Sequence, residues 1–132
     1  MSMLAEAVAW ALPELRRAAE SLMVDTCTVC PVTGVDESTG APTLGTAVYV
    51  GRCKVQTTQA QEANPEAGGA TYTVQRYAVH VPVGAFVPEI DHVVTITAAA
   101  IDVGLVGRKY RVVALLHKSL ATAYRLSVKE IV

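Results

Sequence analysis

Apolar side chains recur every three or four positions over the first 22 residues, which is the spacing of one helical face. The stripe consists of Leu4, Val8, Ala11, Leu15, Ala18 and Leu22. Pro13 interrupts it, so we expect either a kink or a second helix that begins with Pro13. Trp10 lies off the stripe and is either a partly exposed residue at the core edge or an anchor in a subunit contact. Residues 1–22 are therefore predicted to be an N-terminal helix.

From residue 23 onward the pattern changes to alternation, the spacing of half-buried strands. The alternating stretches cover residues 25–29, 48–55, 72–81, 94–98, 109–114 and 124–129. Most of the connections carry turn residues and are too short for the crossover helices that parallel strands need. We therefore expect residues 23–132 to form one mainly β domain, a small six-stranded antiparallel barrel or sandwich.

The segment from Thr58 to Ala70 follows neither period. It is rich in small and polar residues and contains the pair Gly68-Gly69. We predict one long flexible loop over residues 58–70, and loops of this length are often functional. The loop contains Glu62 and Glu66 but no lysine or arginine.

The composition is poor in charge for a small domain. Charged residues make up 17% of the chain and apolar residues 52%, whereas about 25% charged residues is usual. The shortfall indicates a surface that is partly covered by partners. The net charge of −1 gives no overall field that calls for nucleic acid or an acidic membrane. We see neither a signal peptide nor a run of about 18 apolar residues, and expect no membrane span.

Cysteine and histidine offer little chemistry. Cys27 and Cys30 have the spacing of a metal or redox pair, but Cys53 is the only other cysteine, and a redox pair would begin a helix rather than lie within a strand. The low, odd count favours a reducing compartment. The histidines are scattered over different segments, as His80, His92 and His117.

Catalytic signatures are missing as well. We find no G-x-S-x-G elbow and no carboxylate pair suited to acid–base work. The sequence therefore predicts a protein that is not an enzyme and holds neither metal nor cofactor. An oligonucleotide-binding barrel is an alternative, but its tyrosines share their faces with Val, Leu and Ala, which favours core over stacking platform. These tyrosines are Tyr72, Tyr77, Tyr110 and Tyr124.

Several strand-and-turn phrases follow one another in a familiar order. They are Tyr49-Val-Gly-Arg-Cys53, Arg76-Tyr-Ala-Val-His-Val-Pro82, Asp91-His-Val-Val-Thr-Ile, Leu105-Val-Gly-Arg-Lys-Tyr-Arg-Val112 and Tyr124-Arg-Leu-Ser-Val128. From about Val24 onward the chain resembles the small head–tail connector proteins of long-tailed bacteriophages, the head-completion or stopper family. Many relatives have Gly-Asp where this chain has Ile90-Asp91.

The resemblance implies a structural subunit of the virion neck, assembled in the host cytoplasm. Such subunits form a ring, expected to be dodecameric, below the portal and its adaptor and above a tail terminator or tail tube protein. Double-stranded DNA passes through the ring, and the long loop points into the lumen and retains the packaged DNA. A tail-completion or tail-terminator subunit of the same neck is the nearest alternative.

Two sets of residues follow from this implied role. The residues expected to line the lumen are Gln59, Gln61, Glu62, Asn64 and Glu66. Without cations, this loop would not bind the DNA backbone tightly and stall ejection. The residues expected to contact neighbouring subunits or rings are Trp10, Arg108, Lys109, Arg111 and Arg125. For the four basic residues, a plain solvated face is the alternative, because surface ion pairs contribute little.

Overall fold

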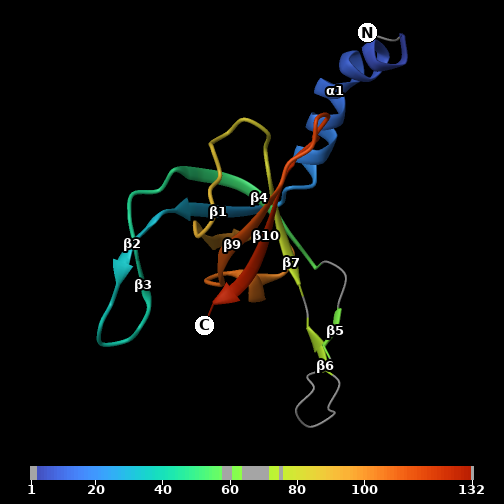
Figure 1. Ribbon diagram of the computed structural model, residues 1–132. Coiled ribbons are helices and arrows are strands. Elements are labelled where there is room, and N and C mark those ends of the chain that lie inside the picture. Colours follow the sequence, from blue (N-terminus) through green and yellow to red (C-terminus); the bar gives the residue numbers. More distant parts are fainter. Residues whose placement is uncertain (1–2, 58–60, 64–71, 75, 132) are drawn as a thin grey trace.

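The computed structural model describes residues 3–57, 61–63, 72–74 and 76–131, and Figure 1 shows their arrangement. The elements are α1 (Met3–Ser21), β1 (Asp25–Cys30), β2 (Val32–Val35), β3 (Pro42–Leu44), β4 (Tyr49–Thr57), β5 (Gln61–Ala63), β6 (Tyr72–Val74), β7 (Tyr77–Val81), β8 (Val93–Ala99), the short 3-10 turn η1 (Val103–Leu105), β9 (Lys109–Leu116) and β10 (Tyr124–Ile131). The described part of the chain is thus mainly β, as predicted.

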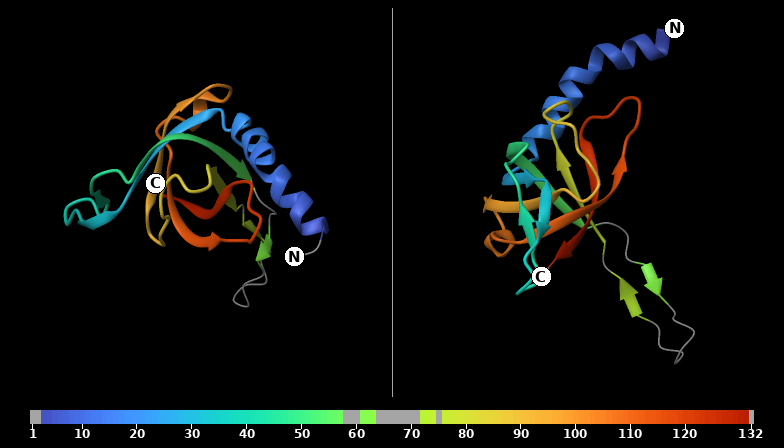
Figure 2. Two further views of the ribbon diagram at one scale, coloured as in Figure 1. Left: turned by 90° about the horizontal axis from the view of Figure 1, so that it is seen from above. Right: turned by 60° about the vertical axis from the view of Figure 1, so that its left-hand side comes forward.

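Six strands close into an antiparallel barrel in the order β1–β4–β7–β10–β9–β8, and β8 pairs back onto β1 (Figures 1 and 2). Each of the six predicted strand regions supplies one strand of this barrel. Of the two architectures left open by the sequence, the barrel is therefore the one that forms. Closure pairs both edges of every strand in the ring and leaves no open sheet edge there.

The barrel interior holds small branched side chains, two cysteines and one fully buried tyrosine. Its members are Cys27, Val29, Cys53, Val79, Val81, Val94, Ile96, Tyr110, Val112, Leu126 and Val128. They are the inward positions of the alternating pattern. Ala98 continues the alternation of Val94 and Ile96 but is exposed, because the β1–β8 register shifts between Thr26 and Cys27 at a β-bulge.

Helix α1 continues through Pro13, so a second helix does not begin there, and the helix bends along its length (Figures 1 and 2). It projects from one end of the barrel, and none of its residues is buried. Buried Met23 follows directly and begins the chain's entry into the barrel. No described helix is long and apolar enough to cross a membrane.

Two short hairpins lie outside the barrel, and the sequence did not predict either. Strands β2 and β3 pair with each other within the connection between β1 and β4. Strands β5 and β6 pair with Gln61 opposite Val74 and Ala63 opposite Tyr72. The prediction that all of 58–70 lacks regular structure is therefore wrong at 61–63.

The strand predicted over 72–81 is also two strands, because β6 pairs with β5 whereas β7 joins the barrel between β4 and β10. Gln-Glu-Ala has low strand propensity, and β5 becomes a strand only because the Tyr-Thr-Val of β6 lies opposite.

Candidate assembly surfaces

Several large apolar side chains of helix α1 are uncovered. Exposed fractions reach 86% at Met3, 76% at Leu4 and 85% at Trp10. Leu15 of the predicted stripe is also exposed, so the stripe does not pack on the barrel. Arg16 ties the helix to the barrel, because its Nε donates a hydrogen bond to the carbonyl oxygen of Ala121 in the β9–β10 loop at 3.0 Å. Large apolar side chains that are left uncovered on one element indicate an interaction site.

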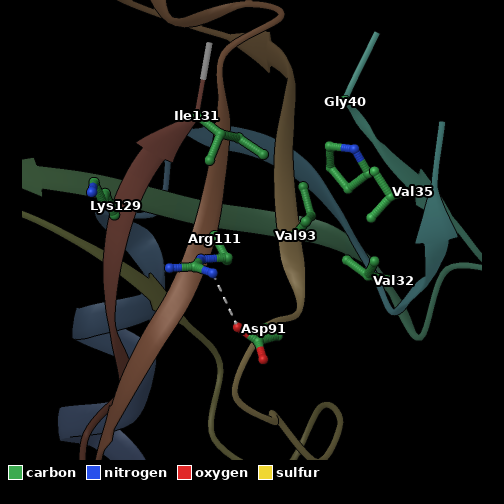
Figure 3. Close-up of a pocket in the computed structure, with 9 residues that line it drawn as sticks. Val32, Val35, Gly40, Asp91, Val93, Arg111, Lys129 and Ile131 are labelled. Atoms are coloured by element: carbon green, nitrogen blue, oxygen red, sulfur yellow. Dashed lines mark ion pairs between the residues drawn. The ribbon is translucent and has the colours of Figure 1, made fainter. Parts of the chain in front are cut away.

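A groove of about 520 Å³ lies between the β2–β3 hairpin and the barrel, at the end of the barrel formed by the start of β9 and the end of β10 (Figure 3). Its lining is mostly aliphatic, with two cations and one carboxylate at the rim. The lining residues are Val32, Val35, Gly40, Pro42, Asp91, Val93, Arg111, Lys129 and Ile131. The groove forms only when the hairpin folds beside the barrel, so no pattern along the sequence predicts it.

The hairpin that walls the groove is shaped by its turn. The carboxylate of Asp36 accepts hydrogen bonds from the backbone N–H and the hydroxyl of Ser38 at 2.9 and 2.7 Å, and these bonds lower the pKa of Asp36. Gly40 has a φ of 74°, which glycine adopts without strain. Asp36, Ser38 and Gly40 therefore shape the turn, and the aliphatic residues that flank it form the wall.

Charge at the groove rim is unbalanced. Arg111 of β9 and Lys129 of β10 are directly opposite each other in the sheet. Asp91, which has a φ of 72°, lies 3.6 Å from Arg111 and partly neutralises it. Like charges that face each other across two strands repel. One cation of the pair therefore remains available for an anionic group from outside.

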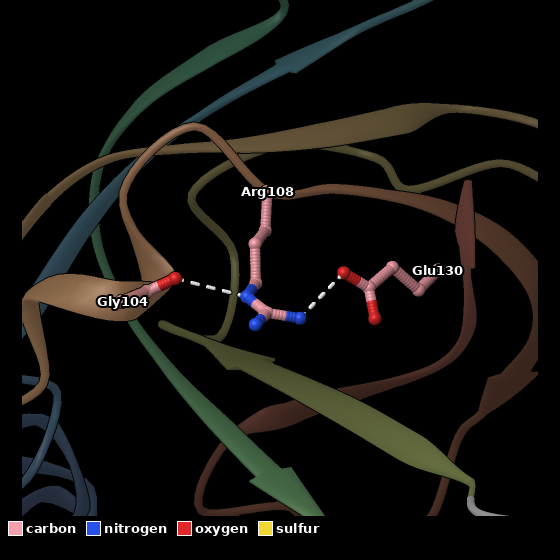
Figure 4. A network of polar contacts seen from close by, with 3 residues as sticks. All are labelled: Gly104, Arg108 and Glu130. Atoms are coloured by element: carbon pink, nitrogen blue, oxygen red, sulfur yellow. Dashed lines mark hydrogen bonds and ion pairs between the residues drawn. The ribbon is translucent and has the colours of Figure 1, made fainter. Parts of the chain in front are cut away.

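Arg108 was predicted to contact a neighbouring ring, but its side chain is engaged within the chain (Figure 4). Its Nε donates to the carbonyl oxygen of Gly104 at 2.9 Å and its Nη1 donates to the Glu130 carboxylate at 2.7 Å. The Glu130 bond raises the pKa of Arg108. The arginine thus ties the η1 turn to the last strand.

A row of basic side chains crosses the outside of three strands. Lys54 of β4 and Arg125 of β10 are the direct cross-strand partners of His80 on β7. Burial of the ring, and then the two cations, lower the pKa of His80 from 6.5 to about 4. Alternation in the sequence puts these residues on wet faces, but only the strand order and register bring them together.

The other predicted contact residues are spread out. Lys109 and Arg111 lie at the start of β9, whereas Arg125 pairs with Leu116 at the far end of that strand. The structure therefore does not gather the four bases into one patch. Of the predicted lumenal residues, Gln61 and Glu62 lie on β5, and Gln59, Asn64 and Glu66 lie outside the described residues.

Two cysteines and four tyrosines are in the barrel core or pack against it, as Cys27, Cys53, Tyr49, Tyr77, Tyr110 and Tyr124. Cys27 is fully buried whereas Cys30 is only partly covered, as expected for residues three apart on a strand. A hydrogen bond with Cys27, followed by burial, raises the pKa of the Cys53 thiol. Burial raises the pKa of Tyr49 to about 12, and its hydroxyl donates to the Arg52 carbonyl oxygen at 2.7 Å. Within the described residues, no three potential metal ligands come together.

Comparison with known proteins places the chain in a family. Residues 15–129 match the family of unknown function DUF6093. The chain belongs to this family. No curated protein and no solved structure matches the chain. The family match begins within helix α1 and runs almost to the end of β10, so the barrel and both hairpins lie within the family's common region.

Proposed function

We propose that this chain is a non-enzymatic structural subunit of the head–tail junction of a tailed bacteriophage. In this proposal it is a head-to-tail stopper or connector that forms a ring below the portal and adaptor and provides the surface on which the tail docks. Double-stranded DNA passes through the ring and is retained there until ejection.

One observation carries the assembly part of this proposal. Helix α1 has 19 residues and none of them is buried, although the barrel core beside it is complete. Most of the stability of a helix in a protein comes from packing of its amphipathic face rather than from helix propensity. A chain with such a helix is expected to be completed by other subunits. The resemblance of the barrel phrases to connector proteins supplies the location in the virion.

The proposal is tested in a phage that carries this gene. With the gene disrupted, we expect DNA-packaged heads that leak their DNA and lack tails, and supplying the wild-type chain should restore whole particles. Tailed, infectious particles from the disrupted phage would refute the proposal. A tail-completion role predicts instead that heads retain their DNA and that free tails of abnormal length accumulate.

Lys54 and Arg125, which flank His80, favour a second candidate, an oligonucleotide-binding barrel, because neighbouring cations attract phosphates. The aromatic side chains argue against it, since Tyr110 is fully buried and Tyr77 packs on it with ring centroids 5.6 Å apart. They are therefore not free to stack on bases. This candidate predicts salt-sensitive binding of single strands by the purified monomer, whereas the structural role predicts none.

A further inference from the structure

We propose that the Trp10 face of helix α1 docks into the β2–β3 groove of a second copy of this chain, so that copies associate head to tail. The inference rests on the proposed function and deepens it, because it names the contact by which neighbouring subunits of the ring would join. It draws on two surfaces of the same chain that each lack a partner within the described residues.

The two surfaces lie at opposite ends of the barrel. Arg16 fixes the helix to the loop between β9 and β10 through Ala121. The groove instead uses the start of β9 and the end of β10, where Arg111 and Ile131 lie (Figure 3). Figure 1 shows the helix and the β2–β3 hairpin projecting in different directions. A helix held in this way does not reach the groove of its own chain.

The helix offers an aromatic anchor between two carboxylates. Glu6, Trp10 and Glu14 are four residues apart, so they follow one another along one face of the helix. The Glu14 carboxylate lies 3.9 Å from the Arg17 guanidinium, so Glu6 is the carboxylate that this face offers to a partner. Trp10 is 85% exposed, and tryptophan is among the residues that most often dominate binding energy at interfaces. The ring would bury most of its surface if it entered a pocket of suitable lining.

The groove offers the matching chemistry. Val32, Val35 and Ile131 give it an aliphatic lining, and its volume of about 520 Å³ is within the range that admits a large side chain. The facing cations Arg111 and Lys129 have only Asp91 as a carboxylate partner among the lining residues. A carboxylate from the incoming helix would relieve their repulsion, and complementary charges also fix the register of docking.

A contact between two different surfaces of the same chain is heterologous. Such a contact closes into a ring when the rotation between neighbours permits and otherwise extends into a filament. A second copy is therefore the occupant that explains both surfaces at once, whereas an unrelated partner would explain only one.

A mixing experiment distinguishes this contact from all symmetric ones. Trp10→Ala removes the anchor and leaves the groove intact, and Val35→Glu places a carboxylate in the groove and leaves the helix intact. By sedimentation velocity, wild-type protein should form oligomers that grow over a concentration series, and each variant alone should remain monomeric. An equimolar mixture should form a heterodimer and nothing larger, since only one helix and one groove are competent.

Fluorescence gives a second readout, because the chain has a single tryptophan. In the mixture only the Val35→Glu chain carries Trp10, and its emission should shift to the blue as the indole leaves water. Val50→Glu is the matched control, since Val50 is 66% exposed, close to the 64% of Val35, but lies on β4 away from the groove. This control variant should still form oligomers.

Three results would overturn the contact: wild-type protein that stays monomeric throughout the series, a Val35→Glu variant that still self-associates, or a mixture without heterodimer. The fate of the proposed function is read separately, from the presence of the chain in particle necks. Necks that contain the chain, together with a failed mixing experiment, would reject this contact and keep the function. Heterodimers with no particle association would do the reverse.

Discussion

The half-buried ring of His80 should make the protein sensitive to mild acid. It lies between Lys54 and Arg125 on the outside of the barrel, and its pKa falls from 6.5 to about 4. Because the folded protein holds this proton more weakly than the unfolded chain does, the unfolded chain binds more protons between these two values. Stability conferred by the neutral ring is therefore present above about pH 6.5 and is lost as the pH falls toward about 4.

The size of the effect follows from the two pKa values. At about 1.36 kcal/mol for each pKa unit, the whole difference would correspond to roughly 3.4 kcal/mol. Solvent screens a ring that is only half buried, so we expect about 1–2 kcal/mol. His80→Gln should remove this contribution. Between neutral pH and about pH 4.5, the free energy of unfolding should therefore fall by about 1–2 kcal/mol more in wild type than in the variant.

Urea denaturation at the two pH values measures this difference, and a titration of the three histidine rings by NMR measures the pKa directly. Exposed His117→Gln is the control and should retain the full acid sensitivity. Arg125→Gln should raise the pKa of His80 by removing one of the two cations. Equal acid sensitivity of wild type and His80→Gln, or a His80 pKa near 6.5, would refute the reasoning.

Three further predictions concern stability and DNA release. Gly107→Ala should lower the free energy of unfolding by about 1–2 kcal/mol, because Gly107 has a φ of 88°. Gly34 has equal space around it and no positive φ, so Gly34→Ala should change the unfolding midpoint little. Leu126→Ala in the core should lower the free energy of unfolding by about 2–5 kcal/mol, and Leu116→Ala at a half-exposed position by less than about 1 kcal/mol. Equal losses of stability in thermal unfolding would contradict the barrel packing. If the proposed function holds, Glu62→Lys with Glu66→Lys should slow DNA ejection from particles, while the double glutamine variant should not; ejection kinetics unchanged by the lysines would remove the lumenal placement of this segment.

The barrel was predictable because its strands carry a strict alternation. In β10, Tyr124, Leu126 and Val128 face the core and Arg125 and Lys129 face out, as the sequence indicates. A one-residue slip would move all of these side chains to the wrong face, so the pattern determines the strand almost by itself. Six antiparallel strands that need to cover their edges favour a barrel or a small sandwich, but the order of the strands was not predicted.

The features outside the barrel were not predictable in the same way. The apolar stripe on α1 predicted the helix, but Leu4 and Leu15 suggested packing that does not occur within the chain. Strands as short as β3 and β5 have too few residues to show a period, and they form because a partner strand lies opposite. The groove depends on where such a hairpin folds, and the basic row around His80 depends on register. Neither the position of the hairpin nor the register of the strands can be read from any single segment of the sequence.

The central claim is that this chain works as an assembled part of the virion neck. Electron cryomicroscopy of necks from a phage that carries the gene, combined with mass spectrometry of the purified particles, tests it most directly. We expect a ring of small barrels between portal and tail, with a helix from each barrel lying against the hairpin of its neighbour. Particles that lack the chain, or a neck density that no ring of these barrels can fill, would contradict the account.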